Sequence, residues 1–262
     1  MEYRELGRTG MRVSLVSLGC MRLPEDDDEA ARVVSHAADS GINYFETSIA
    51  YCGGRSEVKV GKGLRGKRDQ VFVSTKSTFR ENTSADDVRR NIETSLERLG
   101  MDRLDFYQLW DFREPDFDAV TRKGGGLDIL EKLRDEGIID HIGVTSHASN
   151  EMVVKLLETG RLESVTLSYH LLNRTAEPVI EYAGERGIGV VIMTPLAGGV
   201  LAQKSEALEN LVPGERASSA VNALRFLMSN PHVSTIPSGM TRVSDVEENV
   251  RAWREFRALS PS

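Results

Sequence analysis

The feature that most constrains the fold is a repeated alternation of short apolar runs with amphipathic stretches, roughly one pair per thirty residues. The apolar runs are nearly continuous, which is typical of parallel strands buried on both faces. Their alternation with helices predicts a parallel sheet with right-handed crossovers. The predicted strands lie in residues 13–19, 42–47, 71–76, 104–110, 138–146, 165–170, 189–195 and 233–239. The predicted helices lie in residues 28–40, 56–64, 84–99, 126–136, 150–158, 177–186, 218–228 and 243–256.

Eight such units predict a (β/α)8 TIM barrel of the α/β class, which needs about 250 residues. No linker rich in Pro, Gly or Ser interrupts the 262 residues, so we predict one domain over 1–262. The rival fold, an open doubly wound sheet, favours a G-x-G-x-x-G motif after the first strand, and none is there. The glycine run at 124–126 instead predicts the start of a helix. An N-terminal β-hairpin around a turn at 8–10 and a short C-terminal tail complete the expectation.

Charge and composition narrow the classes of partner. The net charge is −7, so we expect neither a nucleic-acid partner nor an anionic membrane surface. No apolar run approaches the roughly 18 residues of a membrane span, and the N-terminus lacks a signal pattern. The two cysteines, Cys20 and Cys52, cannot supply a disulfide framework, and we expect free thiols in a cytoplasmic protein. A small-molecule substrate is therefore expected, and the oligomeric state stays open.

Polar residues at the predicted strand ends mark the candidate site, because barrel enzymes place their chemistry on the loops at the carboxyl ends of the strands. Lys76 ends an uncharged strand and needs an anionic partner if it is buried. Glu46 ends the neighbouring strand, and Tyr51 follows it. A cation beside a phenol is expected to lower the pKa of the phenol and to prepare Tyr51 as a general acid. The alternative is a structural Glu–Lys pair with an incidental tyrosine.

Motifs in a fixed order along almost the whole chain strengthen the catalytic hypothesis. They read GCMRLP, YCGGRSE, VFVSTK, IGVTS, YHLLNR, TPLAGGVL and SGMT followed by VEEN. Together they resemble the aldo-keto reductases, whose members interconvert carbonyls and alcohols with NADP(H) or NAD(H). The resemblance implies that Tyr51 exchanges the proton, that Lys76 tunes it and that Glu46 holds Lys76.

The same resemblance implies a cofactor cleft. Thr145, Ser146 and Thr166 would meet the carboxamide, and Tyr169 would stack on the nicotinamide. The backbone of residues 196–199 would approach the pyrophosphate, and residues near the last strand would hold the adenosine. The implied cofactor-binding residues are Gly19, Met21, Thr145, Ser146, Thr166, Tyr169, Thr194, Leu196, Gly198, Ser238, Gly239, Met240, Thr241, Asp245, Glu248 and Asn249.

Three positions depart from the family pattern. Glu46 stands where the family has Asp, and Trp110 stands where it has the fourth catalytic residue, His. Indole donates one N–H and does not titrate, so Trp110 would shape the oxygen site or simply fill the pocket. Asp245 stands where a cation usually contacts the NADP 2′-phosphate, with Arg242 nearby to compensate. We therefore expect dual cofactor use or NAD(H).

The sequence also allows other functions. His147 and His170 follow predicted strands and could contact substrate or supply acid–base chemistry. With Glu46 and Tyr51 they would suit a non-redox elimination, epimerisation or cyclisation. The missing histidine would equally suit a catalytically silent, cofactor-binding regulatory protein. No ligand spacing supports a metal site. The chain ends soon after the last predicted helix, from which an open pocket and a bulky sugar or natural-product substrate are expected.

Overall fold

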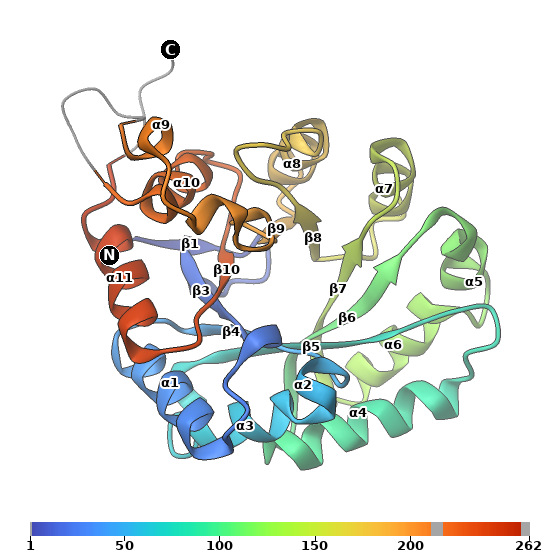
Figure 1. Cartoon of the computed structure of the whole chain (residues 1–262). Coiled ribbons are helices and arrows are strands. Elements are labelled where there is room, and N and C mark those ends of the chain that lie inside the picture. The colour runs from blue at the N-terminus through green and yellow to red at the C-terminus, as the bar shows by residue number, and fades with distance from the viewer. Residues whose placement is uncertain (1, 211–216, 258–262) are drawn as a thin grey trace.

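Eight parallel strands form one closed sheet in the computed structural model, which describes residues 2–210 and 217–257. The sheet order is β10-β3-β4-β5-β6-β7-β8-β9. The edge strands β10 and β9 lie next to each other (Figure 1), and Thr235, just before β10, pairs with Val191 of β9. The predicted (β/α)8 barrel is confirmed. The strands are β3 (Val16–Gly19), β4 (Tyr44–Glu46), β5 (Phe72–Thr78), β6 (Leu104–Phe112), β7 (Ile139–Ser146), β8 (Ser164–Ser168), β9 (Gly189–Met193) and β10 (Ile236–Gly239).

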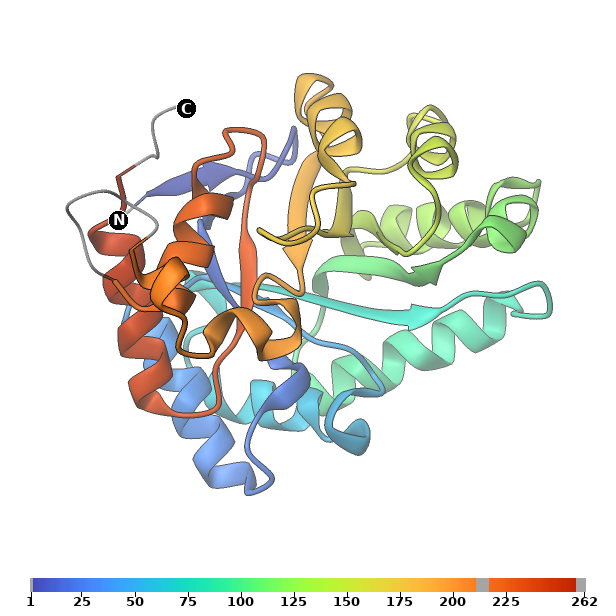
Figure 2. The ribbon, with the colours of Figure 1, turned by 45° about the horizontal axis from the view of Figure 1, so that its top comes forward.

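The long helices surround the strands, and all eight predicted helices are present close to their predicted bounds (Figure 2). Side-chain caps explain several of the starts. Asp26 accepts from the first turn of α1, and Ser84 forms a capping box with Asp87 at α4. As expected, the glycine run starts a helix, since Gly126 begins α6. The helices are α1 (Asp27–Asp39), α3 (Ser56–Gly63), α4 (Ala85–Leu99), α6 (Gly126–Asp135), α7 (Asn150–Leu157), α8 (Glu177–Glu185), α10 (Ser219–Met228) and α11 (Val243–Arg254).

Short helical segments occupy several connections for which the sequence pattern predicts no helix. The connection from β6 to α6 contains η3 (Glu114–Asp116) and α5 (Phe117–Thr121). Two features explain η3. Pro115 lies in its first turn, and the Asp116 carboxylate accepts a hydrogen bond from the Arg113 N–H. The other short segments are η1 (Cys20–Arg22), α2 (Tyr51–Gly54), η2 (Arg68–Gln70), η4 (Ala197–Ala202) and α9 (Glu206–Glu209).

The N-terminal hairpin closes the end of the barrel opposite the strand C-termini. Its strands are β1 (Tyr3–Glu5) and β2 (Arg12–Ser14), so the predicted hairpin is confirmed. Leu6 is fully buried in a small apolar cluster with Tyr44 and Phe106. Arg4 donates 2.7 Å hydrogen bonds to the carbonyls of Asn230 and Val233, which ties the hairpin to the last units of the barrel.

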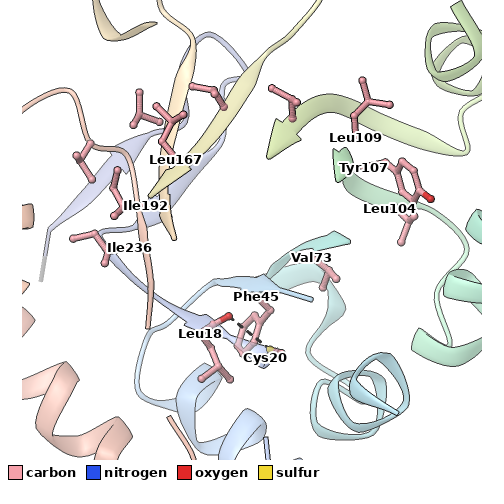
Figure 3. Packing of buried hydrophobic residues seen from close by; sticks show 14 of the residues in the cluster. Leu18, Cys20, Phe45, Val73, Leu104, Tyr107, Leu109, Leu167, Ile192 and Ile236 are labelled. Atoms are coloured by element: carbon pink, nitrogen blue, oxygen red, sulfur yellow. Dashed lines mark hydrogen bonds between the residues drawn. The ribbon is translucent and has the colours of Figure 1, made fainter. Parts of the chain in front are cut away.

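The main apolar core runs between the strands and the surrounding helices. Figure 3 shows part of it, with side chains contributed by strands all around the sheet. Among residues 2–210 and 217–257, no helix is both long and apolar enough to cross a membrane. The predicted C-terminal tail falls mainly on 258–262, outside the described residues, and the single-domain organisation stays a prediction.

Candidate active site

The carboxyl ends of β4 and β5 bring Glu46 and Lys76 together. Lys76 is only 2% exposed, and its Nζ forms an ion pair with Glu46 Oε1. Nζ also donates a 2.9 Å hydrogen bond to the Thr47 carbonyl. Burial lowers the pKa of Lys76 to about 7, because an ammonium loses its hydration there. The partnership of Glu46 with Lys76 that the strand ends suggested is present in the structure.

Tyr51 lies over this pair, on the short α2 segment that follows β4. The Lys76 Nζ is 4.5 Å from the centroid of the Tyr51 ring, a cation–π contact with the ring face. The Trp110 ring meets Tyr51 edge to face, with centroids 5.7 Å apart and planes at 88°. All four predicted catalytic side chains therefore meet at one mouth of the barrel.

The protonation of Tyr51 differs from the expectation. Burial, with a smaller contribution from the neighbouring Cys20, raises the pKa of Tyr51 to about 12. The prediction that Lys76 lowers this pKa is wrong for the structure. The ammonium lies over the ring face, and desolvation of the phenolate dominates. The phenol is therefore protonated at neutral pH and holds a proton that it can donate.

A bulge in β6 orients Trp110. The register between β6 and β7 shifts between Leu109 and Phe112. Asp111 adopts a left-handed φ of 58°, and its N–H donates to the Thr145 hydroxyl at 2.8 Å. Bulges beside active sites redirect side chains, and here the bulge accompanies the contact of Trp110 with Tyr51.

Cys20 belongs to this site, although the sequence suggested only a free thiol. It is fully buried in η1 after β3, where Figure 3 shows it in the core near Phe45. It interacts electrostatically with both Tyr51 and Lys76, and burial raises its pKa, so the thiol stays protonated. The Cys52 thiol points to the Cys20 carbonyl at 3.6 Å. The one available sequence signal was the position of Cys20 at a strand end.

The predicted carboxamide residues lie inside the barrel wall. Thr166 donates to the Gln108 side-chain oxygen at 2.7 Å, and Ser146 donates to the Phe112 carbonyl at 3.3 Å. Both are buried. Thr194, predicted as a cofactor-binding residue without a specified contact, shares a 2.7 Å hydrogen bond with Ser168 and is exposed at the mouth.

Tyr169 is not brought to the mouth. It is 2% exposed, its ring lies 5.4 Å from Phe226 of α10, and its hydroxyl donates to Glu177 at 2.7 Å. The Tyr169 side chain therefore lies between the barrel and the surrounding helices α8 and α10. Stacking on a nicotinamide would require Tyr169 to give up its contacts with Phe226 and Glu177.

The two histidines lie apart from Tyr51 in the contacts of the described residues. His147 is exposed after β7 and interacts electrostatically with Asp111. His170 is half-buried, its backbone pairs with Asn173, and burial lowers its pKa. Neither is therefore a direct acid–base partner of Tyr51 in this arrangement. Residues 2–210 and 217–257 contain no cluster of three or more metal-ligating side chains.

The turn after β9 leaves bare backbone at the mouth. Ala197, Gly198 and Gly199 have φ values of 50°, 70° and 105°, and an added Cβ at either glycine would meet nothing within 4 Å. Half-buried Leu196 precedes them. Arg22 donates to the Gly198 carbonyl at 3.3 Å, which links this turn to the loop carrying the exposed Met21. Such open glycine backbone fits the close approach of a phosphate.

The end of β10 adds a second open backbone position and a polar pair. Gly239 is exposed, with nothing within 4 Å of an added Cβ, whereas Gly19 packs against Pro237 of β10. Asn249 of α11 donates to the buried Ser238 hydroxyl at 3.5 Å. Met240 is buried beside them.

The Asp245 carboxylate already has partners in the turn where α11 begins. It accepts from the Thr241 N–H at 3.0 Å and forms a 3.0 Å ion pair with Arg242. Burial alone would raise its pKa, but these hydrogen bonds outweigh burial and lower it, so Asp245 is anionic. Glu248 accepts from the Ser218 hydroxyl at 2.9 Å. The Arg242 guanidinium is thus partly neutralised before any ligand arrives.

The fold and this mouth define a class of protein: a barrel enzyme with a protonated phenol, a buried lysine and a carboxylate at the strand ends. The chain belongs to the Aldo/keto reductase family, whose model matches residues 15–262. This membership confirms the predicted resemblance, the oxidoreductase class and the use of a nicotinamide cofactor. It leaves the choice between NAD(H) and NADP(H) open.

Relatives of known name align over almost the entire chain. L-galactose dehydrogenase of Arabidopsis thaliana is 32% identical over 99% of this chain and 90% of its own length. The holo form of aldo-keto reductase AKR11C1 from Bacillus halodurans superposes with a TM-score of 0.85 at 26% identity, covering 99% and 93% of the two chains. An aldo/keto reductase from Klebsiella pneumoniae, solved with NADP and acetate, shares the fold at 23% identity with a TM-score of 0.84, covering 99% and 92%.

Proposed function

We propose that this protein interconverts a carbonyl and an alcohol with NAD(P)(H), and that Tyr51 exchanges the proton at the substrate oxygen. The observation that carries the proposal is the protonated phenol of Tyr51, which contacts both Lys76 and Trp110. A positioned general acid contributes about 10²–10⁴-fold to such a reaction. When bound, the nicotinamide supplies or accepts the hydride.

The neighbours of Tyr51 have separable roles in this proposal. The Lys76 cation stabilises negative charge that develops on the Tyr51 oxygen as the proton leaves. Glu46 favours the charged form of Lys76 despite its burial, because removal of the carboxylate would leave the ammonium unpaired. Trp110 offers an indole N–H to the substrate oxygen in place of the imidazole found in the family.

The open backbone at Gly198, Gly199 and Gly239 supports a phosphate-bearing cofactor along this side of the mouth. Ser238 and Asn249 are the candidate polar contacts for its adenosine end. Arg242 is already paired with Asp245 and is a weak partner for a 2′-phosphate. We therefore propose dual cofactor use or a preference for NAD(H). Titration with NADH and NADPH, followed by tryptophan quenching, measures that preference.

A polyhydroxylated substrate fits the proposal best. The relative named L-galactose dehydrogenase is 32% identical across the chain. Trp110 also places a flat aromatic ring beside Tyr51, and sugar rings pack on such surfaces. We propose an aldose or a related sugar or sugar-like natural product as the substrate class. The cytoplasm is the proposed location.

The decisive experiment compares Tyr51→Phe with wild-type protein on a panel of aldoses and aliphatic carbonyls, following absorbance at 340 nm. We expect at least one aldose to turn over, and the variant to lose about 10²–10⁴-fold in kcat while still binding NAD(P)H. Tyr182→Phe, which removes a hydroxyl on α8, is the matched control and should retain full activity. Full turnover by Tyr51→Phe would refute the proposed role.

A further inference from the structure

A buried carboxylate lies behind the candidate active site, on a helix that the proposed chemistry does not use. Glu57 of α3 is 0% exposed. Its Oε1 accepts a 2.6 Å hydrogen bond from the hydroxyl of Thr75, the residue before Lys76 in β5. A carboxylate at such a depth is strongly destabilising unless charge and hydrogen bonds compensate it. Glu57 therefore needs a cation.

Arg98 of α4 supplies that cation and reaches further. Its Nη1 lies 3.5 Å from Glu57 Oε2 and donates a 2.9 Å hydrogen bond to the carbonyl of Ile49. Ile49 lies two residues before Tyr51 in the same loop. One carboxylate thus connects, through Thr75, to the strand carrying Lys76 and, through Arg98, to the loop carrying Tyr51.

The loop itself needs such an anchor. Cys52, Gly53 and Gly54, directly after Tyr51, all have left-handed φ values, 53°, 62° and 84°. A left-handed non-glycine residue such as Cys52 is strained, and such strain persists only where the surroundings hold it. The hydrogen bond from the Ile49 N–H to the Lys76 carbonyl is long, at 3.4 Å, so the Arg98 bond is the tighter link at this residue.

We infer that Glu57 and Arg98 are positioning residues for the proposed reaction: together they set the position of Tyr51 relative to Lys76. Neither touches the reacting atoms. Their effect comes through the Tyr51–Lys76 contact, and a displacement of about 1 Å in such a contact can cost about 10²-fold in rate. The expected loss of kcat rests on the proposed function. The expected displacement of the Tyr51 loop rests on geometry alone.

The kinetic test uses Arg98→Met, Arg98→Lys and Glu57→Gln, with Arg89→Met as the matched control. Arg89 lies on the same helix and pairs with Glu136 at the surface. We expect Arg98→Met and Glu57→Gln to lower kcat by about 10–100-fold, with KM for NAD(P)H within about twofold. Arg89→Met should match wild type.

Arg98→Lys separates positioning from stability. Lysine keeps a positive charge for Glu57, but its side chain is one bond shorter than that of arginine, so its ammonium should not reach both Glu57 and the Ile49 carbonyl as Arg98 Nη1 does. We expect its Tm to approach the wild-type value while kcat stays several-fold lower. Should Arg98→Met fail to fold, Arg98→Lys carries the test. Wild-type kcat in Arg98→Lys would overturn the inference.

A structural measurement is independent of turnover. Trp110 is half-buried beside Tyr51, whereas Trp253, the other tryptophan, is 1% exposed. Iodide quenching therefore reports mainly on Trp110. We expect stronger quenching in Arg98→Met and Glu57→Gln and no change in Arg89→Met. If wild-type protein turns over no substrate, the proposed function fails, yet this quenching still decides the inference: unchanged quenching in all variants would refute it.

Discussion

At the scale of single residues, the Glu46–Lys76 pair places opposite charges where water hardly reaches. Lys76 is buried by the barrel wall, and its cation serves Tyr51 only while it stays protonated. Burial lowers its pKa to about 7 in the folded chain, and the ion pair with the carboxylate of Glu46 favours the charged form. The pair therefore couples stability to function.

Glu46→Gln should extend to below pH 7 the range in which stability rises with pH. The folded pKa of Lys76 is about 7 with the carboxylate present, against about 10.4 in the unfolded chain, and loss of the carboxylate lowers the folded pKa further. Between the folded and unfolded values the unfolded state binds one more proton, so the free energy of unfolding increases by up to about 1.4 kcal/mol per pH unit. Denaturant unfolding of the variant and wild type between about pH 5 and 9 measures it.

The control for this prediction is the double variant Glu46→Gln/Lys76→Met, which lacks the amine. It should lose the slope that Glu46→Gln gains. An equal slope in the two variants would mean that Lys76 is not the group that titrates, and that the charge of the pair resides elsewhere.

At the scale of elements, α4 illustrates how local sequence defines a helix that the site then uses. The Ser84 hydroxyl accepts from the Asp87 N–H at 3.2 Å, and the Asp87 carboxylate accepts from the Ser84 N–H at 3.0 Å. Near the other end of the helix, Arg98 contacts the Tyr51 loop. The start of the helix at Ser84 could be predicted from the sequence, whereas the contact of Arg98 with the Tyr51 loop could not.

Ser84→Ala should lower the free energy of unfolding by about 1 kcal/mol, because the backbone N–H of Asp87 loses its acceptor. Ser84→Asp restores an acceptor and should stay close to wild type. Urea denaturation compares the two. A loss of equal size in both variants would show that the hydroxyl acts through something other than the cap.

The β6 bulge is the contrasting case. An apolar run at 104–110 predicts a strand equally well with or without a register shift. The shift depends on how Asp111 meets Thr145 of β7, a contact between residues 34 positions apart. Trp110 could therefore be assigned to a strand end from the sequence, but its contact with Tyr51 could not.

At the scale of the whole molecule, the hairpin seals the closed barrel through close backbone contact. Gly7 has a φ of 58°, and an added Cβ would lie 2.4 Å from the Gly189 nitrogen and 2.5 Å from the Gly187 oxygen. Both contacts are backbone atoms that side-chain motion cannot relieve. The seam between the hairpin and β9 thus requires glycine.

Gly7→Ala should destabilise the protein by about 3 kcal/mol, from left-handed strain of about 1–2 kcal/mol and overpacking of about 1–3 kcal/mol. Gly10→Ala is the matched control, because Gly10 is also left-handed at 75° but has nothing within 4 Å of the added Cβ. It should show the strain alone. Thermal unfolding of the two variants makes the comparison, and equal Tm losses would contradict it.

The periodic pattern of the chain was sufficient for the barrel, because apolar periodicity, helix caps and turn residues act over a few neighbours. The same pattern put Glu46, Lys76 and Trp110 at strand ends, and parallel strands bring such ends to one mouth. Closure of the barrel decided the rest: the pKa of Tyr51, the approach of Cys20, the outward turn of Tyr169 and the link from Arg98 to Ile49. These features depend on burial and on contacts between residues that are far apart in the sequence. A periodic pattern along the chain does not specify the distances between such residues in space.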